Sequence, residues 1–311
     1  MRIAIFGTGG VGGYFGGRLA AAGADVAFVA RGAHLQALRA HGLRIESPNG
    51  DVHVPRVVAT DETRDIGPVD AVLFTVKMYD VASAAPRLAP LVGPDTVVVT
   101  LQNGVEAVDL AARHVPRAQV AGGVAYVAAV IDRPGVIRHT ALARLIFGEL
   151  DGRASPRLER LRDACARAGF EAVVSPRIDV DLWSKFARLS VFSGMTAVTR
   201  SPVGVLRSDP ELLAMLTAAC EETLAVGRAR GVPLPETLMG EILAMVNSLP
   251  GEAKASMLED LERGRPLELP WLSGAVVRLG REAGVATPIH RFIAAVLAPF
   301  VHGAPATAAA P

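Results

Sequence analysis

Short, mostly apolar runs alternate with stretches of helical spacing in the N-terminal part of the chain. The runs lie at residues 3–6, 26–30, 69–76 and 96–101, and apolar positions recur at helical spacing within 14–22, 32–40 and 81–91. A continuous apolar run is typical of a strand covered on both faces, and strands that alternate with helices pair in parallel. The pattern therefore predicts an α/β domain built on a doubly wound parallel sheet.

Residues 43–60 and 120–174 add further strands. Residues 43–60 alternate around the turn signal Pro48-Asn49-Gly50-Asp51, which predicts strands joined by a turn. Two long apolar segments, 120–131 and 136–147, predict a strand pair, and a helix and a last strand are expected within 158–174.

The pattern changes after residue 177, where only helical spacing remains. We expect helices at 179–192, 210–230, 238–249, 256–263 and 269–283, and a last one after Pro288. The sequence thus predicts two domains: an α/β domain over 1–176 and an all-helical domain over 177–302. The last residues, 303–311, are mainly Ala and Pro, and we expect them to be a disordered tail.

Composition excludes several classes of partner. The formal net charge is +1, from 32 basic and 31 acidic residues, which gives no electrostatic reason to expect nucleic acid or an anionic membrane. The two cysteines, Cys165 and Cys220, form no metal-binding motif and no disulfide framework. No apolar run reaches the ~18 residues of a membrane helix, and no signal peptide is evident. We therefore expect a cytoplasmic protein without a metal.

A glycine-rich turn follows the first predicted strand. Gly7-Thr8-Gly9-Gly10-Val11-Gly12 reads GxGxxG between a strand and a helix, the context in which this motif binds a dinucleotide in a Rossmann-type fold. Gly7 permits the tight turn, Gly9 lets the backbone approach a pyrophosphate, and Gly12 lets helix and strand pack closely. The phosphates would lie at the positive end of the helix. The alternative is a turn that is glycine-rich only for packing.

The end of the second predicted strand indicates which dinucleotide binds. NAD enzymes usually place Asp or Glu there to hold the ribose 2′-hydroxyl, whereas this sequence has Arg31. A planar guanidinium suits a 2′-phosphate, so we expect NADP(H), unless Arg31 is merely a solvated surface residue. Lys77 and Asn103 follow two further strands and should face the nicotinamide half of the cofactor, because ligands bind beyond the carboxyl ends of such strands.

Several motifs together resemble the ketopantoate reductase (2-dehydropantoate 2-reductase) family. Besides the glycine turn and Arg31, they are TVK at 75–77, LQNG at 101–104, LWSKF at 182–186, a serine-to-glutamate motif at 256–268 and GVATP at 284–288. The resemblance covers almost the whole chain and implies NADPH-dependent reduction of a 2-oxo acid, as in pantothenate biosynthesis. It also implies a Rossmann domain, a helical domain and an active site between them.

The same resemblance assigns roles to individual residues. It implies that Lys185 is the catalytic lysine and that Glu268 hydrogen-bonds the reacting oxygen. Ser256 would bind substrate, and Asn103 would serve both cofactor and substrate. From the residues alone, a lone lysine on a helix is more often solvated than catalytic.

The chain departs from the family where substrate recognition is decided. Family members resemble KxxxNxxxN after the lysine, whereas here the two asparagine positions hold Leu189 and Ser193. Spacings of four place these side chains on the helix face of Lys185, so we expect them to line the substrate pocket. A leucine there removes a donor and an acceptor, which favours a 2-oxo acid with a more apolar tail.

Two other functions stay open at this point. One is a related NADP-dependent hydroxy acid dehydrogenase with another substrate, since a lysine serves either direction. The other is a regulatory protein that binds NADP(H) without turnover. The apolar helices could bury a homodimer interface or only the domain's own core.

Overall fold

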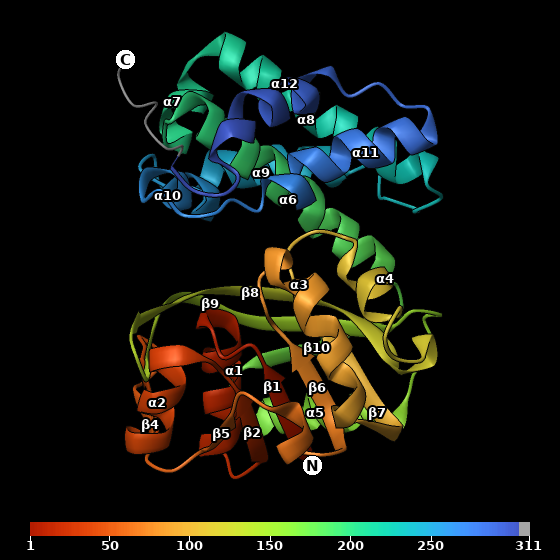
Figure 1. Ribbon diagram of the computed structural model, residues 1–311. Coiled ribbons are helices and arrows are strands. Elements are labelled where there is room, and N and C mark those ends of the chain that lie inside the picture. The colour runs from red at the N-terminus through yellow and green to blue at the C-terminus, as the bar shows by residue number, and fades with distance from the viewer. Residues whose placement is uncertain (305–311) are drawn as a thin grey trace, which may run out of the picture. The chain divides into compact units, whose positions relative to one another are not determined.

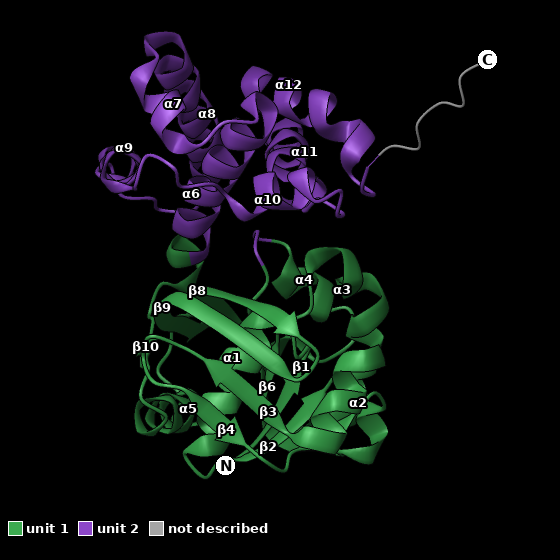
Figure 2. Cartoon of the chain, turned by 90° about the vertical axis from the view of Figure 1, so that its left-hand side faces the viewer, with its two compact units in different colours: residues 1–102, 106–181 green, residues 103–105, 182–311 purple. Residues whose placement is uncertain are grey.

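The computed structural model describes residues 1–304, which form two compact units (Figure 2). Unit 1 comprises residues 1–102 and 106–181, and unit 2 comprises residues 103–105 and the chain from 182 onward. The short segment 103–105 therefore groups with unit 2, although it directly follows a strand of unit 1. The expected disordered tail falls mostly on 305–311, which lie outside the described residues.

Unit 1 is built on one mixed sheet with a parallel centre (Figure 1). Its strands are β1 (Arg2–Phe6), β2 (Asp25–Val29), β3 (Leu43–Glu46), β4 (Val52–Val54), β5 (Val58–Thr60), β6 (Val69–Phe74), β7 (Val92–Thr100), β8 (Val120–Arg133), β9 (Val136–Glu149) and β10 (Glu171–Val174). Their order is β4-β3-β9-β8-β7-β6-β1-β2-β5, with β10 paired to β9. Strands β8, β7, β6, β1, β2 and β5 run parallel. The apolar runs predicted this for β1, β2, β6 and β7.

The parallel centre reverses its winding between β1 and β6. From β1 the chain proceeds to β2 on one side, and β6, on the other side of β1, leads on to β7 and β8. Such a reversal point is where an open α/β sheet binds its ligand, beyond the carboxyl ends of the strands.

Helix α1 (Gly10–Ala21) packs against β3, β4 and β9 as well as against the parallel strands β1, β2 and β8, so the sheet curls around it. A Cβ at Gly13 would lie 2.7 Å from the Ile137 side chain, and one at Gly17 would lie 2.7 Å from Ile45. The many glycines of α1 therefore reflect packing against the curled sheet as well as the ligand turn.

The remaining helices of unit 1 are α2 (Gly32–His41), α3 (Met78–Ala84), α4 (Ala107–Ala111) and α5 (Pro156–Arg167). The helix predicted at 81–91 is only partly α-helical: it begins at Met78 and becomes a 3-10 helix at Ala85–Leu91. Pro86 and Pro90 explain the change, because proline cannot donate the α-helical hydrogen bond. The predicted run 43–60 also divides: β3 and β4 pair antiparallel, whereas β5 joins β2 at the other edge.

Unit 2 is helical, and the described residues from 178 to 304 contain no strand. Its helices are α6 (Ile178–Thr199, whose first turn belongs to unit 1), α7 (Val203–Ser208), α8 (Pro210–Ala229), α9 (Leu238–Ser248), α10 (Ser256–Glu262), α11 (Ser273–Ala283) and α12 (Pro288–Leu297). The sequence did not predict α7, which is short. The helix predicted at 269–283 is interrupted at Leu272 after a 3-10 turn that contains Pro270.

Side chains that define the interior of unit 2 include a buried histidine. His290 of α12 is fully buried, and its Nε2 lies 2.8 Å from Thr223 Oγ1 and 3.0 Å from the Ala219 carbonyl oxygen. The Glu222 carboxylate of α8 accepts hydrogen bonds from the backbone N–H groups of Ile289 and His290, at 2.8 and 3.0 Å. One acid thus caps the first turn of a neighbouring helix, where unpaired N–H groups need an acceptor.

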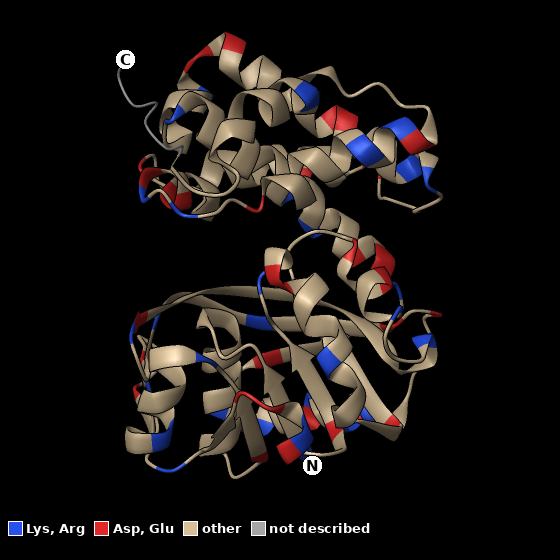
Figure 3. Ribbon diagram, viewed as in Figure 1, with Lys and Arg blue, Asp and Glu red and all other residues tan. Residues whose placement is uncertain are grey.

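Aromatic residues and cysteines divide between the units. Both tryptophans, Trp183 and Trp271, belong to unit 2, whereas all three tyrosines, at 14, 79 and 126, belong to unit 1. Cys165 and Cys220 are buried free thiols, and burial raises the pKa of each to about 12. Lys, Arg, Asp and Glu are interspersed on both units (Figure 3). No helix within residues 1–304 is long and apolar enough to cross a membrane.

Candidate functional site

The glycine turn closes tightly over the ends of β1 and β2. Gly7 has φ +111°, and the N–H groups of Gly7 and Thr8 donate to the Val29 carbonyl oxygen at 3.2 and 3.1 Å. A Cβ at Gly12 would lie 2.3 Å from the Gly7 oxygen, so only glycine lets α1 begin this close to the turn. A Cβ at Gly9 would meet nothing within 4 Å. Gly9 therefore presents an open stretch of backbone, which is what a close-lying ligand needs.

Gly10 has a different role from its neighbour. A Cβ there would lie 2.0 Å from the Ala129 carbonyl oxygen of β8, so its glycine is required by packing inside the protein. Val11, the next residue of α1, is partly buried. Binding of a cofactor by Gly10 and Val11 stays a prediction.

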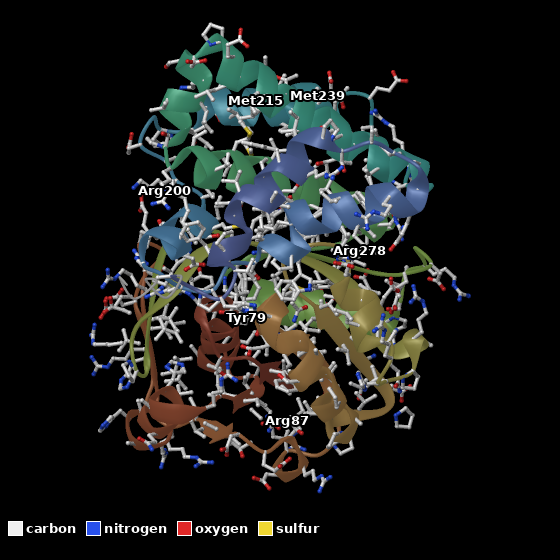
Figure 4. All side chains as sticks on the ribbon, turned by 45° about the horizontal axis from the view of Figure 1, so that its top comes forward. Tyr79, Arg87, Arg200, Met215, Met239 and Arg278 are labelled. Carbon is white, nitrogen blue, oxygen red and sulfur yellow. The ribbon has the colours of Figure 1, made fainter. Side chains whose placement is uncertain are left out.

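A pocket of about 360 Å³ lies beside the turn in unit 1. Its lining combines residues that follow β1, β2 and β6, and includes Gly7, Gly9, Arg31, His34, Lys77 and Asp80. The pocket thus occupies the carboxyl ends of the strands at the reversal point, where the sequence placed the dinucleotide. Lys77 is exposed at the start of α3. Arg87, which is labelled in Figure 4, lines the same pocket, and its guanidinium lies over the Phe6 ring.

Arg31 forms an ion pair that the sequence did not reveal. Its Nη2 lies 2.8 Å from Oδ2 of Asp80, in the first turn of α3. The Arg31 side chain is 80% exposed, whereas that of Asp80 is 27% exposed, so the acid is the more enclosed partner. The pair forms across 49 residues of sequence, and no local pattern connects them.

His34 lines the same pocket as a neutral ring. Its Nδ1 accepts the Gly135 N–H at 3.1 Å, which places the proton on the buried Nε2. Burial lowers the pKa of His34, although the nearby Thr8 backbone opposes that shift. The ring therefore adds no charge to the pocket at neutral pH.

Three of the predicted active-site residues gather within unit 2. The Asn103 amide donates from Nδ2 to Glu268 Oε2 at 3.1 Å, and Glu268 is only 6% exposed. Lys185, on α6, interacts electrostatically with the same carboxylate. Burial of its ammonium lowers the pKa of Lys185 to about 8, although the Glu268 charge acts in the opposite direction. A lysine in this state can hold a proton at neutral pH and release it readily.

The predicted substrate residues differ in exposure. Leu189 and Ser193 follow Lys185 by one and two turns of α6. Leu189 is partly buried, and Ser193 is 2% exposed. Ser256 is the exposed first residue of α10. Their contact with substrate stays a prediction. Asp260 of the same motif lies 3.9 Å from Arg265 (Oδ1 to Nη1), which agrees with a structural role.

The fold and these groups define a class of protein. A glycine turn at the reversal point of a parallel sheet is a means of binding a dinucleotide, and a lysine with a lowered pKa is suited to proton transfer at an oxygen. The chain is an oxidoreductase that uses a nicotinamide cofactor.

Within that class, the chain belongs to the ketopantoate reductase family. The family model described as "Ketopantoate reductase PanE/ApbA" matches residues 3–152, and "Ketopantoate reductase PanE/ApbA C terminal" matches residues 177–300. The 2-dehydropantoate 2-reductase of Mesorhizobium japonicum is 36% identical over 93% of this chain and 94% of its own. That of Archaeoglobus fulgidus is 31% identical over 94% of this chain and 95% of its own.

A solved structure supports the same conclusion. The crystal structure of a PanE/ApbA family ketopantoate reductase from Ralstonia eutropha JMP134 matches with a TM-score of 0.89 and 34% identity. The match covers 97% of this chain and 98% of that chain. The resemblance inferred from the motifs is thereby confirmed, and so is the fold class.

Proposed function

We propose that the protein reduces the carbonyl of a small 2-oxo acid to a 2-hydroxy acid with NADPH, the substrate being 2-dehydropantoate or a close relative. The observation that carries this proposal is the partly buried Lys185 beside the buried Glu268, with the pKa of the lysine lowered to about 8. Relatives that align along nearly the full chain are named 2-dehydropantoate 2-reductase.

The pocket of unit 1 fits the proposed cofactor, which supplies the hydride when bound. The open backbone at Gly9 leaves room for a pyrophosphate, and Arg31 offers a planar cation for a 2′-phosphate. Lys77 and Arg87 add two further cations to the pocket lining. These groups support NADPH over NADH, because an acid at the Arg31 position would be expected for NADH.

The residues of unit 2 supply the proton. Reduction of a ketone builds negative charge on its oxygen, and an ammonium at that oxygen stabilises the charge and donates the proton. Glu268 favours the protonated form of Lys185 by its charge, and Asn103 orients Glu268 through its hydrogen bond. Burial lowers the pKa of Lys185 to about 8, so the ammonium can give up its proton to the substrate oxygen.

Substrate preference is expected to follow Leu189. A leucine where the family has asparagine offers no partner for the hydroxyl of 2-dehydropantoate. We therefore expect 2-oxo acids that have an apolar tail and lack this hydroxyl to be turned over at least as efficiently. A much higher kcat/KM for 2-dehydropantoate would contradict this part of the proposal.

The direct test is NADPH oxidation over a panel of 2-oxo acids that includes 2-dehydropantoate. Lys185→Ala should lower kcat by ~10²-fold or more, the scale of general acid catalysis. Lys254→Ala is the matched control, because Lys254 pairs on the surface of the same unit with Glu262, at 2.6 Å. Turnover that survives Lys185→Ala would remove this lysine from the mechanism.

The same assay, together with NADP⁺ reduction by a set of 2-hydroxy acids, separates the two other functions. A regulatory protein would bind NADPH without consuming it on any member of the panel. A hydroxy acid dehydrogenase with another substrate would reduce NADP⁺ with a 2-hydroxy acid outside the panel.

A further inference from the structure

In the pocket of unit 1, an acidic side chain forms an ion pair with Arg31, the residue that is expected to recognise a 2′-phosphate. Asp80 and Arg31 both line the pocket, and their side chains are joined at 2.8 Å. The Asp80 backbone is held in the first turn of α3, because its N–H donates to the Lys77 carbonyl oxygen at 2.9 Å and its carbonyl oxygen accepts from Ser83 Oγ at 2.9 Å. The carboxylate is thus placed by a helix, whereas the Arg31 side chain is largely exposed.

A bound 2′-phosphate would share the Arg31 guanidinium with this carboxylate. Nη2 of Arg31 already donates to Asp80, so a phosphate must use the other N–H groups or displace the acid. In either arrangement, two anions lie against one cation, and their repulsion is only partly screened because Asp80 is 27% exposed. An unphosphorylated ribose adds no such repulsion.

The acid also offers what an unphosphorylated ribose needs. In NAD enzymes, a carboxylate at the end of the second strand accepts the 2′-hydroxyl. Here that position is Arg31, and a carboxylate reaches the same pocket from the segment after β6 instead. The other acid of the lining, Asp61, lies 3.8 Å from Arg39 and is not paired with Arg31.

We infer that Asp80 determines cofactor selectivity by opposing the 2′-phosphate at Arg31, so that the chain distinguishes NADPH from NADH less sharply than Arg31 alone would allow. This inference rests on the proposed binding of a nicotinamide dinucleotide in this pocket. It gives Asp80 a role in specificity and none in the chemical step.

The test is Asp80→Asn, which removes the charge and keeps the shape. The ratio of kcat/KM for NADPH to that for NADH should rise about tenfold, the order expected for one partly screened charge contact. The change should lie in KM, with kcat unchanged for both cofactors. Asp80→Ala should move the ratio in the same direction, which guards against a folding defect of one variant.

The control is Asp25→Asn. Asp25 is an exposed acid at the opposite end of β2 and lies 3.6 Å from Arg2, so it matches Asp80 in pairing with an arginine but is remote from the pocket. Its substitution should leave the ratio unchanged. An unchanged ratio in Asp80→Asn overturns the inference, and so does a lower ratio, which would mean that Asp80 orients Arg31 for the phosphate.

Binding measurements separate this inference from the proposed function. Dissociation constants for NADP⁺ and NAD⁺, measured by calorimetric titration of the full chain, need no turnover. If no 2-oxo acid is reduced, the proposed function fails, while an increase in the NADP⁺ preference of Asp80→Asn still supports the role of Asp80. If turnover is found but Asp80→Asn changes neither the binding ratio nor the kinetic ratio, only the inference on Asp80 fails.

Discussion

At the scale of single residues, two opposing influences act on the Lys185 ammonium. Burial lowers its pKa to about 8, and the Glu268 carboxylate raises it. The reduction uses the protonated form, so the fraction of competent enzyme decreases as the pH rises through the pKa. The balance between this partly buried cation and its acid therefore determines the working pH range.

We predict that kcat/KM for the 2-oxo acid falls as pH rises above about 8, because this parameter reports the ligand pocket of the free protein. Glu268→Gln removes the charge that raises the Lys185 pKa, so the same decrease should begin at lower pH in this variant. A pH series of kcat/KM for the 2-oxo acid measures both. A limb that stays in place or moves to higher pH would show that Glu268 does not act through the lysine.

The two adjacent glycines Gly9 and Gly10 should respond differently to substitution by alanine. Gly10→Ala places a Cβ 2.0 Å from the Ala129 carbonyl oxygen. Neither atom can move aside without a shift of the backbone, so we expect the free energy of unfolding to fall by ~1–3 kcal/mol. Gly9→Ala meets nothing within 4 Å, so the stability should be kept while NADPH binds more weakly. Urea unfolding and NADPH titration of the pair check this prediction, and equal stability losses would contradict it.

At the scale of elements, α8 and α12 are joined by polar groups that are sensitive to acid. Burial lowers the pKa of His290 to about 4, whereas the free ring has a value of 6.5. Between these values the unfolded chain binds a proton that the folded chain does not. Stability from this site is therefore full above about pH 6.5 and is lost as the pH falls toward about 4.

We predict that the free energy of unfolding decreases by about 3 kcal/mol from this group over that range. His290→Gln should show a weaker pH dependence, because it has no ring to protonate. His302→Gln, at an exposed position of the same unit, should keep the wild-type dependence. Urea denaturation at pH 7 and pH 4.5 gives the change in the free energy of unfolding between the two pH values. An identical change for all three proteins would refute the assignment to His290.

The sequence predicted elements well where the signal is local. Buried strands such as β6 appear as apolar runs, and the long helices appear through their spacing. It could not predict that β5 joins β2 and not the β3–β4 hairpin, because strand partners depend on distant chain segments. For the same reason the sequence did not reveal that Asp80 pairs with Arg31, whereas Arg31 and Lys77 could be predicted because each directly follows a recognisable strand.

The helical half shows the value of family motifs over periodicity. Asn103 and Glu268 are 165 residues apart, and no spacing rule connects them. The resemblance named both, and the structure brings them into hydrogen-bonding distance within unit 2. Local pattern alone would have left Lys185 as one more helical lysine.

At the scale of the whole molecule, a ligand bound in the pocket of unit 1 should stabilise that unit. The proposed cofactor pocket is lined wholly by unit 1, in which all the tyrosines lie. We predict that NADP⁺ at a hundredfold excess over Kd adds ~2.7 kcal/mol to the unfolding transition that tyrosine absorbance reports. Second-derivative absorbance during urea titration measures it, and a transition that does not move would place the dinucleotide elsewhere.

The tryptophans give the complementary view, because Trp183 and Trp271 both belong to unit 2. Light absorbed by their indoles is emitted at wavelengths that reduced nicotinamide absorbs. Quenching of indole emission during titration with NADPH would therefore act as a molecular ruler from the helical unit to a dinucleotide held by the other, with no dye attached to the protein.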